Sequence, residues 1–152
     1  DRDVDGYIRF LNRGNPIAQN YVQVGYDEDS PNVLWEVSAQ REEKDIYTIT
    51  YTATIKDGYH GFPMSDIFAA PYFEIEGAEL LGDVFEPLTP VENGIDDFTG
   101  EPAYIYRDRA VYTQRVRAKA GSLLNCYVNA TICANDTNCC TSNIVEFLLK
   151  LP

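Results

Sequence analysis

The fold class is decided by the stretch Asp45-Ile46-Tyr47-Thr48-Ile49-Thr50-Tyr51-Thr52-Ala53-Thr54-Ile55. From Tyr47 to Ile55 its odd positions are apolar or aromatic, and its even positions are all threonine. Side chains alternate between the two faces of a β-strand, and β-branched and aromatic residues favour strands. We therefore predict a strand with one buried face and one polar face.

The same alternation recurs along the chain and predicts about nine strands. Besides 45–55, the candidates are residues 7–11, 18–26, 33–40, 72–76, 79–85, 103–119, 123–132 and 144–151. No window keeps the 3.6-residue apolar spacing of a helix beyond a short turn at 64–70. The sequence predicts an all-β fold with little helix: a single antiparallel β-sandwich, immunoglobulin-like in general architecture, formed by one domain over residues 1–152.

All four cysteines lie within 15 residues, at Cys126, Cys133, Cys139 and Cys140. Their spacing does not match the close pairs of a zinc site, and an oxidising compartment would join them in two disulfides. An extended strand places Cys126 and Cys133 about 23 Å apart, and a bridge between the adjacent Cys139 and Cys140 is strained. We predict a disulfide-clamped hairpin over 126–140, with Cys126 and Cys133 paired to Cys139 and Cys140 in an order that the sequence leaves open.

The only two Asn-x-Thr sequons, at Asn129 and Asn135, fall inside the same stretch. Strand alternation puts Cys126 on the buried face and Asn129 on the exposed one, while Asn135 lies in a polar turn. The sequence predicts N-linked glycans on both, with ordinary surface asparagines as the alternative. Together with the cysteines, the sequons predict a secreted or cell-surface protein.

The net charge of −12 and a pI near 4.3 argue against binding to nucleic acid. No segment has the roughly 20 apolar residues of a membrane span. Cationic partners suit such a chain better.

The N-terminal segment resembles a calcium loop of the EF-hand or dockerin type over its first eight positions, with Asp1, Asp3 and Asp5 as the candidate ligands. Arg9 and Asn12 occupy positions where such a loop carries further ligands. The sequence therefore favours a solvated acidic segment and no cofactor, with calcium as the alternative.

Five cations, Arg107, Arg109, Arg115, Arg117 and Lys119, have odd numbers within 103–119. A continuous strand would place them on one face, where they could meet an acidic patch on another copy or an anionic glycan. The alternative is pairing with acids on neighbouring strands.

The C-terminal run 144–152 is apolar on nearly both faces, with Val145, Phe147 and Leu149 on one parity. Such a strand can complete the sheet of a neighbouring molecule, which predicts a homo-oligomer or polymer.

Enzyme motifs are absent from the sequence. The only histidine, His60, stands in a predicted turn with no nucleophile motif near it. We therefore predict a non-enzymatic extracellular structural or adhesion subunit that assembles into a filament or surface layer by β-strand addition. Two alternatives stay open: a calcium-dependent, lectin-like module with a glycan ligand, and a hydrolase with two close carboxylates.

Overall fold

The computed structural model describes residues 21–24, 32–96, 99–137 and 139–152. The described residues form strands and no helix. This part of the chain therefore contains no helix that could cross a membrane. The strands are β1 (Tyr21–Val24), β2 (Val33–Glu43), β3 (Ile46–Ile55), β4 (Tyr59–Gly61), β5 (Tyr72–Glu76), β6 (Glu79–Phe85), β7 (Val91–Ile95), β8 (Pro102–Arg107), β9 (Arg109–Arg117), β10 (Leu123–Ala134) and β11 (Cys140–Lys150).

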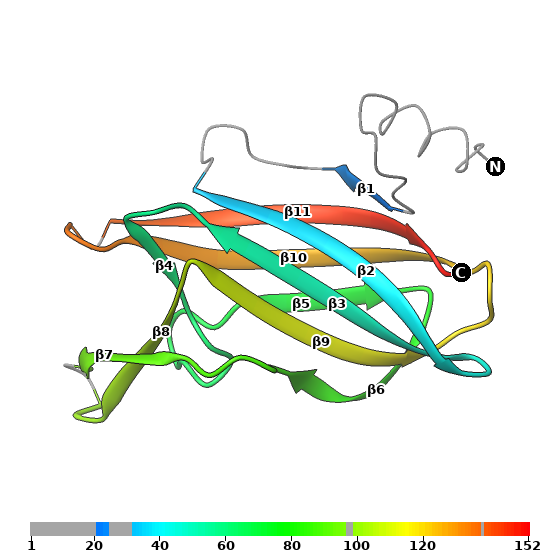
Figure 1. Ribbon diagram of the computed structural model, residues 1–152, viewed down its shortest axis with the longest axis horizontal. Helices are drawn as coiled ribbons and strands as arrows, with labels where there is room; N and C mark the ends of the chain where they lie inside the picture. The colour runs from blue at the N-terminus through cyan, green and yellow to red at the C-terminus, as the bar shows by residue number, and fades with distance from the viewer. Residues whose placement is uncertain (1–20, 25–31, 97–98, 138) are drawn as a thin grey trace.

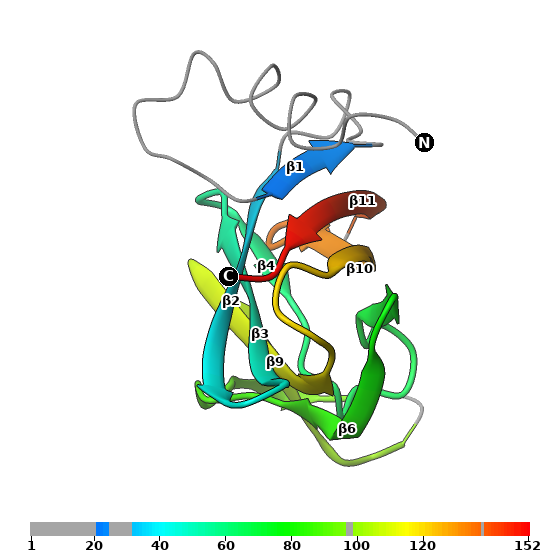
Figure 2. The same cartoon turned by 90° about the vertical axis from the view of Figure 1, so that its right-hand side faces the viewer.

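The strands form two layers of antiparallel sheet (Figures 1 and 2). The first sheet has the order β1-β11-β10-β4-β8-β7, and β5 also pairs with β10. The second sheet has the order β2-β3-β9-β6. The predicted all-β, antiparallel β-sandwich is confirmed.

The core lies between the two sheets. In β3 the side chains of Tyr47, Ile49 and Tyr51 are buried, whereas the threonines between them face outward. Tyr51 meets Phe147 of the opposite sheet with ring centroids 6.5 Å apart. Large aromatic and aliphatic side chains contribute most to such a core, because the free energy gained scales with the apolar area buried. The alternation in 45–55 thus describes its strand correctly.

The predicted strand 103–119 is wrong, because the chain changes sheet in its middle. Asp108 has a φ of 60°, a left-handed conformation that Asp adopts more readily than most residues. β8 lies before it in the first sheet and β9 after it in the second. The five cations therefore do not share one face.

Two of these cations pair with acids of their own sheet: Arg117 with an acid on the adjacent strand β6, as the alternative predicted, and Arg115 with an acid on β2, across the intervening β3. Arg115 contacts Glu42 at 2.9 Å, and Arg117 contacts Glu79 at 3.0 Å. All four side chains are exposed, so each pair contributes at most about 1 kcal/mol. Arg107 donates instead to the Asn93 side chain.

The C-terminal strand completes a sheet of its own chain. β11 lies between β1 and β10, with Tyr21 opposite Leu149. Val145, Phe147 and Leu149 are buried in the core, so they are packing residues and not surfaces for another copy.

Two strands and one turn differ from the sequence prediction. β4 has only three residues and β7, Val-Glu-Asn-Gly-Ile, has no alternation, so neither was predicted. Residues 64–70 form turns without a helix. The candidate strand 7–11 and the candidate calcium ligands Asp1, Asp3 and Asp5 lie outside the described residues. Among the residues that are described, no group of three or more His, Cys, Asp or Glu side chains could hold a metal.

Candidate functional site

A single disulfide closes the end of the β10–β11 hairpin. Cys133 in β10 and Cys140 at the start of β11 are register partners, and their sulfurs are bonded. The Ala134 N–H donates to the Cys139 carbonyl at 2.8 Å, which continues the pairing by one residue into the turn. Cys133 is buried, at 4 % exposure, whereas Cys140 is exposed. A reagent in solution therefore reaches the bond from the Cys140 side.

The only histidine of the chain lies beside this disulfide. His60 in β4 is the register partner of Cys133 on the other edge of β10. Directly opposed residues in an antiparallel pair point to the same face, with Cβ atoms about 4.5 to 5.5 Å apart. A Cβ on the next residue, Gly61, would contact Ile55 and Ile132 in the core, so His60 points to the outer face. Cys140, Cys133 and His60 therefore stand in a row across three strands.

The hairpin turn holds the histidine ring in place. The His60 Nδ1 and the Asn135 Oδ1 are 2.6 Å apart, and the Asn135 N–H donates to the Gly58 carbonyl at 2.9 Å. Because an amide oxygen only accepts hydrogen bonds, this contact puts a proton on Nδ1. In the neutral ring, Nε2 then carries the free lone pair. The ring also meets the edge of Phe62, with centroids 5.3 Å apart.

Buried side chains fix the segment that follows β4. The Tyr112 hydroxyl donates to the Phe62 carbonyl at 2.7 Å, and the Met64 N–H donates to Glu86 at 2.9 Å. Tyr106 donates to the same carboxylate at 2.6 Å. Burial, aided by the charge of Glu86, raises the pKa of the Tyr112 hydroxyl, so it stays a donor. These bonds position β4 and hence His60.

The remaining cysteines differ from the prediction of two disulfides. Cys126 is a free thiol in the core, opposite Phe147, and Cys139 is a free, exposed thiol in the turn. Strand alternation correctly placed Cys126 on the inner face. That same placement separates it from the disulfide, which lies at the far end of β10.

Both sequon asparagines lie on accessible parts of the hairpin but make contacts of their own. The Asn129 Oδ1 accepts a bond from the Ser142 hydroxyl at 2.8 Å. Asn135 is exposed and contacts His60 as described above.

The outer face of the first sheet also carries an acidic hollow. A pocket of about 180 Å³ is lined by Glu74, Glu76, Asn125, Tyr127 and Glu146. Tyr127 and Glu146 are register partners on the same strands that carry the disulfide. The negative charge of the chain thus extends along the face on which the disulfide lies.

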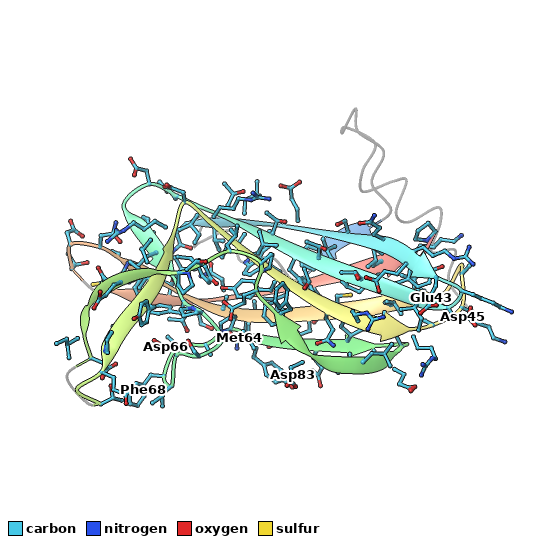
Figure 3. The ribbon with its side chains drawn as sticks, turned by 60° about the horizontal axis from the view of Figure 1, so that its bottom comes forward. Glu43, Asp45, Met64, Asp66, Phe68 and Asp83 are labelled. Atoms are coloured by element: carbon cyan, nitrogen blue, oxygen red, sulfur yellow. A yellow bond between two sulfur atoms is a disulfide. The ribbon has the colours of Figure 1, made fainter. Side chains whose placement is uncertain are left out.

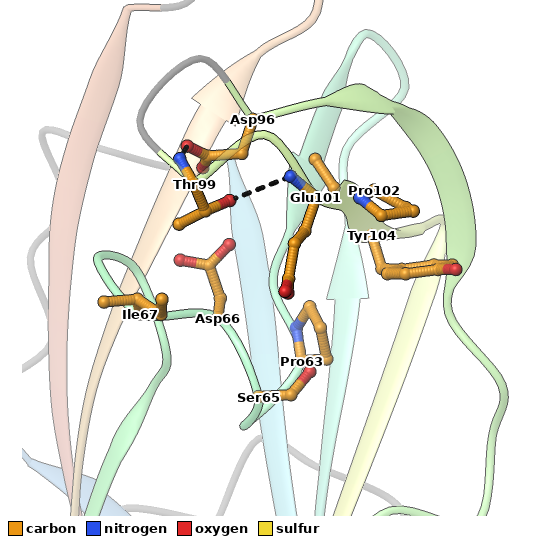
Figure 4. Close-up of a pocket in the computed structure, with 10 residues that line it drawn as sticks. Pro63, Ser65, Asp66, Ile67, Asp96, Thr99, Glu101, Pro102 and Tyr104 are labelled. Carbon is orange, nitrogen blue, oxygen red and sulfur yellow. Dashed lines mark hydrogen bonds between the residues drawn. The ribbon is translucent and has the colours of Figure 1, made fainter.

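A second pocket, of about 70 Å³, lies between the β4–β5 segment and the β7–β8 turn (Figure 4). The Asp66 carboxylate accepts bonds from the Phe68 and Ala69 N–H groups, and Asp96 accepts one from Thr99. Phe68 and Asp66 project from their loop at the edge of the molecule (Figure 3). These carboxylates serve their own turns, so the disulfide remains the stronger candidate site.

No protein-family model matches this sequence, and no curated protein matches it. Solved structures do have similar folds. The N-terminal domain of Neisseria meningitidis DsbD, solved in the reduced form, is 18 % identical over 82 % of this chain and 89 % of its own, with a TM-score of 0.59. This is the fold of the DsbD N-terminal domains.

Two more structures support the same likeness. The N-terminal periplasmic domain of ScsB from Proteus mirabilis has a TM-score of 0.65 at 14 % identity, over 88 % of this chain. The match spans about half of that longer chain, 52 %. The complex between the DsbD and PilB N-terminal domains of Neisseria meningitidis matches with a TM-score of 0.54 at 19 % identity, over 78 % of this chain and 83 % of the other.

These findings correct the functional predictions. The filament or adhesion subunit, and its lectin-like alternative, are wrong, because the similar folds are DsbD and ScsB domains and β11 pairs within its own chain. The predicted homo-oligomer or polymer carrying its own glycans is wrong too, since the complex of known structure joins a DsbD domain to a different protein. The prediction of no enzymatic role is overturned by a disulfide on this fold. A location outside the cytoplasm agrees with the periplasmic ScsB domain.

Sequence reasoning missed His60 for a specific reason. It is 73 positions before Cys133, and a three-residue strand that contains Gly61 has no periodic signal. The one available signal was the Asp57-Gly58 turn, which predicts a reversal of the chain just before His60.

Proposed function

We propose that this chain is a thiol-disulfide exchange protein of the periplasm, which cycles Cys133 and Cys140 between a disulfide and a dithiol. The observation that carries the proposal is the pairing of a buried and an exposed cysteine at the turn end of a hairpin, beside a histidine. The matching fold supports it, because one DsbD domain with this fold was solved in a reduced form. The partner is a second protein that carries a dithiol or a disulfide.

The exchange proceeds in two steps. A thiolate of the dithiol partner attacks the exposed Cys140 sulfur, forms a mixed disulfide, and releases Cys133 as a thiolate. The second thiolate of the partner then attacks the partner's own sulfur in the mixed disulfide and releases Cys140 as a thiolate. The partner leaves oxidised, and both cysteines of this chain are reduced by two electrons in total. The reverse sequence reduces a partner that carries a disulfide.

His60 handles the proton of Cys133 in this scheme. When Cys133 leaves, the imidazole beside it, if protonated, stabilises the new thiolate by charge or donates a proton to it. When Cys133 must attack, the neutral ring accepts its proton at Nε2, because Asn135 holds Nδ1. Loss of the Asn135 contact would let the His60 ring shift, and both roles of the ring would be weakened.

The proposal is tested by redox titration of the folded protein with dithiothreitol and its oxidised form, followed by acid quenching, alkylation and mass spectrometry. We expect a reversible two-electron reduction confined to Cys133 and Cys140. Cys126→Ala is the matched control, because its thiol is buried outside the site, and it should titrate like the natural sequence. A bond that resists reduction until the protein unfolds would overturn the proposal.

The role of His60 is tested by the rate of reduction near neutral pH. His60→Ala should slow the reaction by about tenfold, because the proton of Cys133 loses its partner. Asn135→Ala, which keeps the imidazole but removes its fixed tautomer, should give an intermediate rate. An unchanged rate in His60→Ala would show that the histidine only packs against the disulfide.

A further inference from the structure

We propose that Cys139 is an internal nucleophile that moves the disulfide from Cys133–Cys140 to Cys133–Cys139 and back. This inference rests on the proposed function, because it concerns the same redox site. Cys139 is not an isolated thiol: it is exposed, free, and joined by one peptide bond to a cysteine that is already oxidised. A disulfide is an electrophile for any thiolate that can reach one of its sulfurs.

The backbone places Cys139 within reach of Cys133. The Cys139 carbonyl accepts the bond from the Ala134 N–H at 2.8 Å, so the two cysteines are diagonal neighbours across the hairpin. The Cα atoms of the register partners Cys133 and Cys140 are 4.0 Å apart. One residue along the strand adds about 3.4 Å, so the Cα atoms of Cys133 and Cys139 are about 5 Å apart. Disulfides join Cα atoms roughly 4.4 to 6.8 Å apart.

The position of Cys139 before the strand gives its side chain the freedom to turn. β11 begins at Cys140, so Cys139 lies just before the strand and is tied to β10 through its carbonyl, which leaves its side-chain direction less fixed than inside the strand. Its own N–H makes a long bond of 3.4 Å to the Thr137 hydroxyl. Rotation about the backbone at Cys139 can thus direct its sulfur to Cys133 without shifting the register of β10 and β11.

The step balances without any external oxidant. The Cys139 thiolate attacks the Cys133 sulfur, a Cys139–Cys133 bond forms, and the Cys133–Cys140 bond breaks. Cys140 leaves with the electron pair as a thiolate and takes up the proton that Cys139 gave to solvent. Attack on the Cys140 sulfur would instead form a bridge between adjacent residues, which is strained. Cys133, shielded from reagents in solution, is the productive target for a thiol inside the turn.

The exchange gives the oxidised protein two forms with different exposed thiols, Cys139 in one and Cys140 in the other. To detect them, oxidised protein is held at about pH 6 to about pH 9, quenched in acid, denatured, alkylated with N-ethylmaleimide and fragmented between residues 139 and 140. Cys126 is alkylated in every sample and serves as the internal reference.

We expect label on both Cys139 and Cys140, with a share on Cys140 of about a tenth or more, which corresponds to two forms within about 1.4 kcal/mol. The rate at which label appears on Cys140 should rise about tenfold per pH unit while thiols are mostly protonated, because the thiolate is the attacking species. Label confined to Cys139 at every pH would overturn the proposal.

Two variants complete the test. Cys139→Ser should carry no label on Cys140 when oxidised, and Cys140→Ser should form a Cys133–Cys139 disulfide in a glutathione buffer while keeping its strand content by circular dichroism. A Cys140→Ser variant that stays folded but remains a dithiol would contradict the exchange. Cys139→Ser also separates the two proposals: if it is still reduced and reoxidised reversibly, the redox function stands whatever the outcome for Cys139.

Discussion

Cys126 and Cys140 show how position alone separates an inert cysteine from a reactive one. Both belong to the same hairpin, but Cys126 is 0 % exposed in the core, whereas Cys140 lies at an exposed strand end. Burial raises the pKa of the Cys126 thiol to about 11, because a thiolate loses its hydration there. Cys126 is therefore a small apolar packing residue at neutral pH.

The raised pKa of Cys126 predicts a loss of stability at alkaline pH. In the unfolded chain this thiol ionises about two pH units lower, so between about pH 9 and 11 the folded state binds more protons than the unfolded state. The free energy of unfolding should fall across that window by about 3 kcal/mol from this group, and the contribution is intact below it. Urea titrations at successive pH values measure the fall.

Cys126→Ala is the matched control for this measurement. It removes the titrating thiol, so the variant should lack this fall, and its free energy of unfolding relative to that of the natural sequence should rise by about 3 kcal/mol from about pH 9 to 11. Tyr112, whose pKa burial also raises, titrates in both proteins and cancels in the comparison. The pKa of Tyr51 is raised by burial and by its contact with Cys126, so the measured difference reports the Tyr51–Cys126 pair. Parallel curves would mean that Cys126 is not protected from solvent as the core packing indicates.

The β10–β11 hairpin shows why the disulfide is suited to being opened. It links residues only seven positions apart, and those strands are already paired along their whole length. In the chain-entropy description, a short closed loop restrains the unfolded state less than a long one does. The bond therefore contributes less than one that closes a long loop would, and the core between the two sheets does not depend on it.

Reduction should consequently leave the fold intact. We expect the free energy of unfolding to fall by about 2 to 3 kcal/mol when the Cys133–Cys140 bond is reduced, with no loss of strand signal in circular dichroism. The fluorescence of Trp35, the only tryptophan and buried at 2 %, reports the unfolding transition. The double variant Cys133→Ser, Cys140→Ser should match the reduced protein, and unfolding of either one in the absence of urea would contradict this account.

The elements also mark the limit of what the sequence could predict. Where a strand crosses the whole core, as 45–55 does, alternation identified it and its buried face. At Asp108 a single left-handed residue moves the chain to the other sheet, and periodicity continues across it without a signal. The functional site depends on register between strands far apart in sequence, Cys133 with His60, which local patterns do not contain.

At the scale of the molecule, the net charge of −12 favours the approach of positively charged reagents to the disulfide and disfavours negatively charged ones. Asp57 and Asp136 stand in the two turns that border it, and the glutamates of the acidic pocket lie on the same outer face. A field of one sign raises the local concentration of the opposite charge and lowers that of its own. A partner with a basic surface around its cysteines is favoured.

Small thiols of opposite charge test this directly. Cysteamine should reduce the Cys133–Cys140 bond about tenfold faster than thioglycolate, after the rate of each thiol is divided by its rate with a neutral linear disulfide, oxidised 2-mercaptoethanol. The ratio should fall towards one at about 1 M salt, where the screening length is only about 3 Å. A ratio that does not respond to salt would assign the preference to local contacts and not to the charge of the molecule.

The place of β11 between β1 and β10 governs the order in which this molecule can be made. Synthesis runs from the N-terminus, so β1 is exposed long before its only described partner strand exists. Residues as early as Tyr21 must wait for Leu149 to leave the ribosome before the first sheet can close. Cys133 and Cys140 emerge shortly before that event, so the disulfide cannot form before most of the sandwich has been synthesised. A nascent chain arrested before β11 would expose the apolar face of β10, and we expect it to depend on a chaperone.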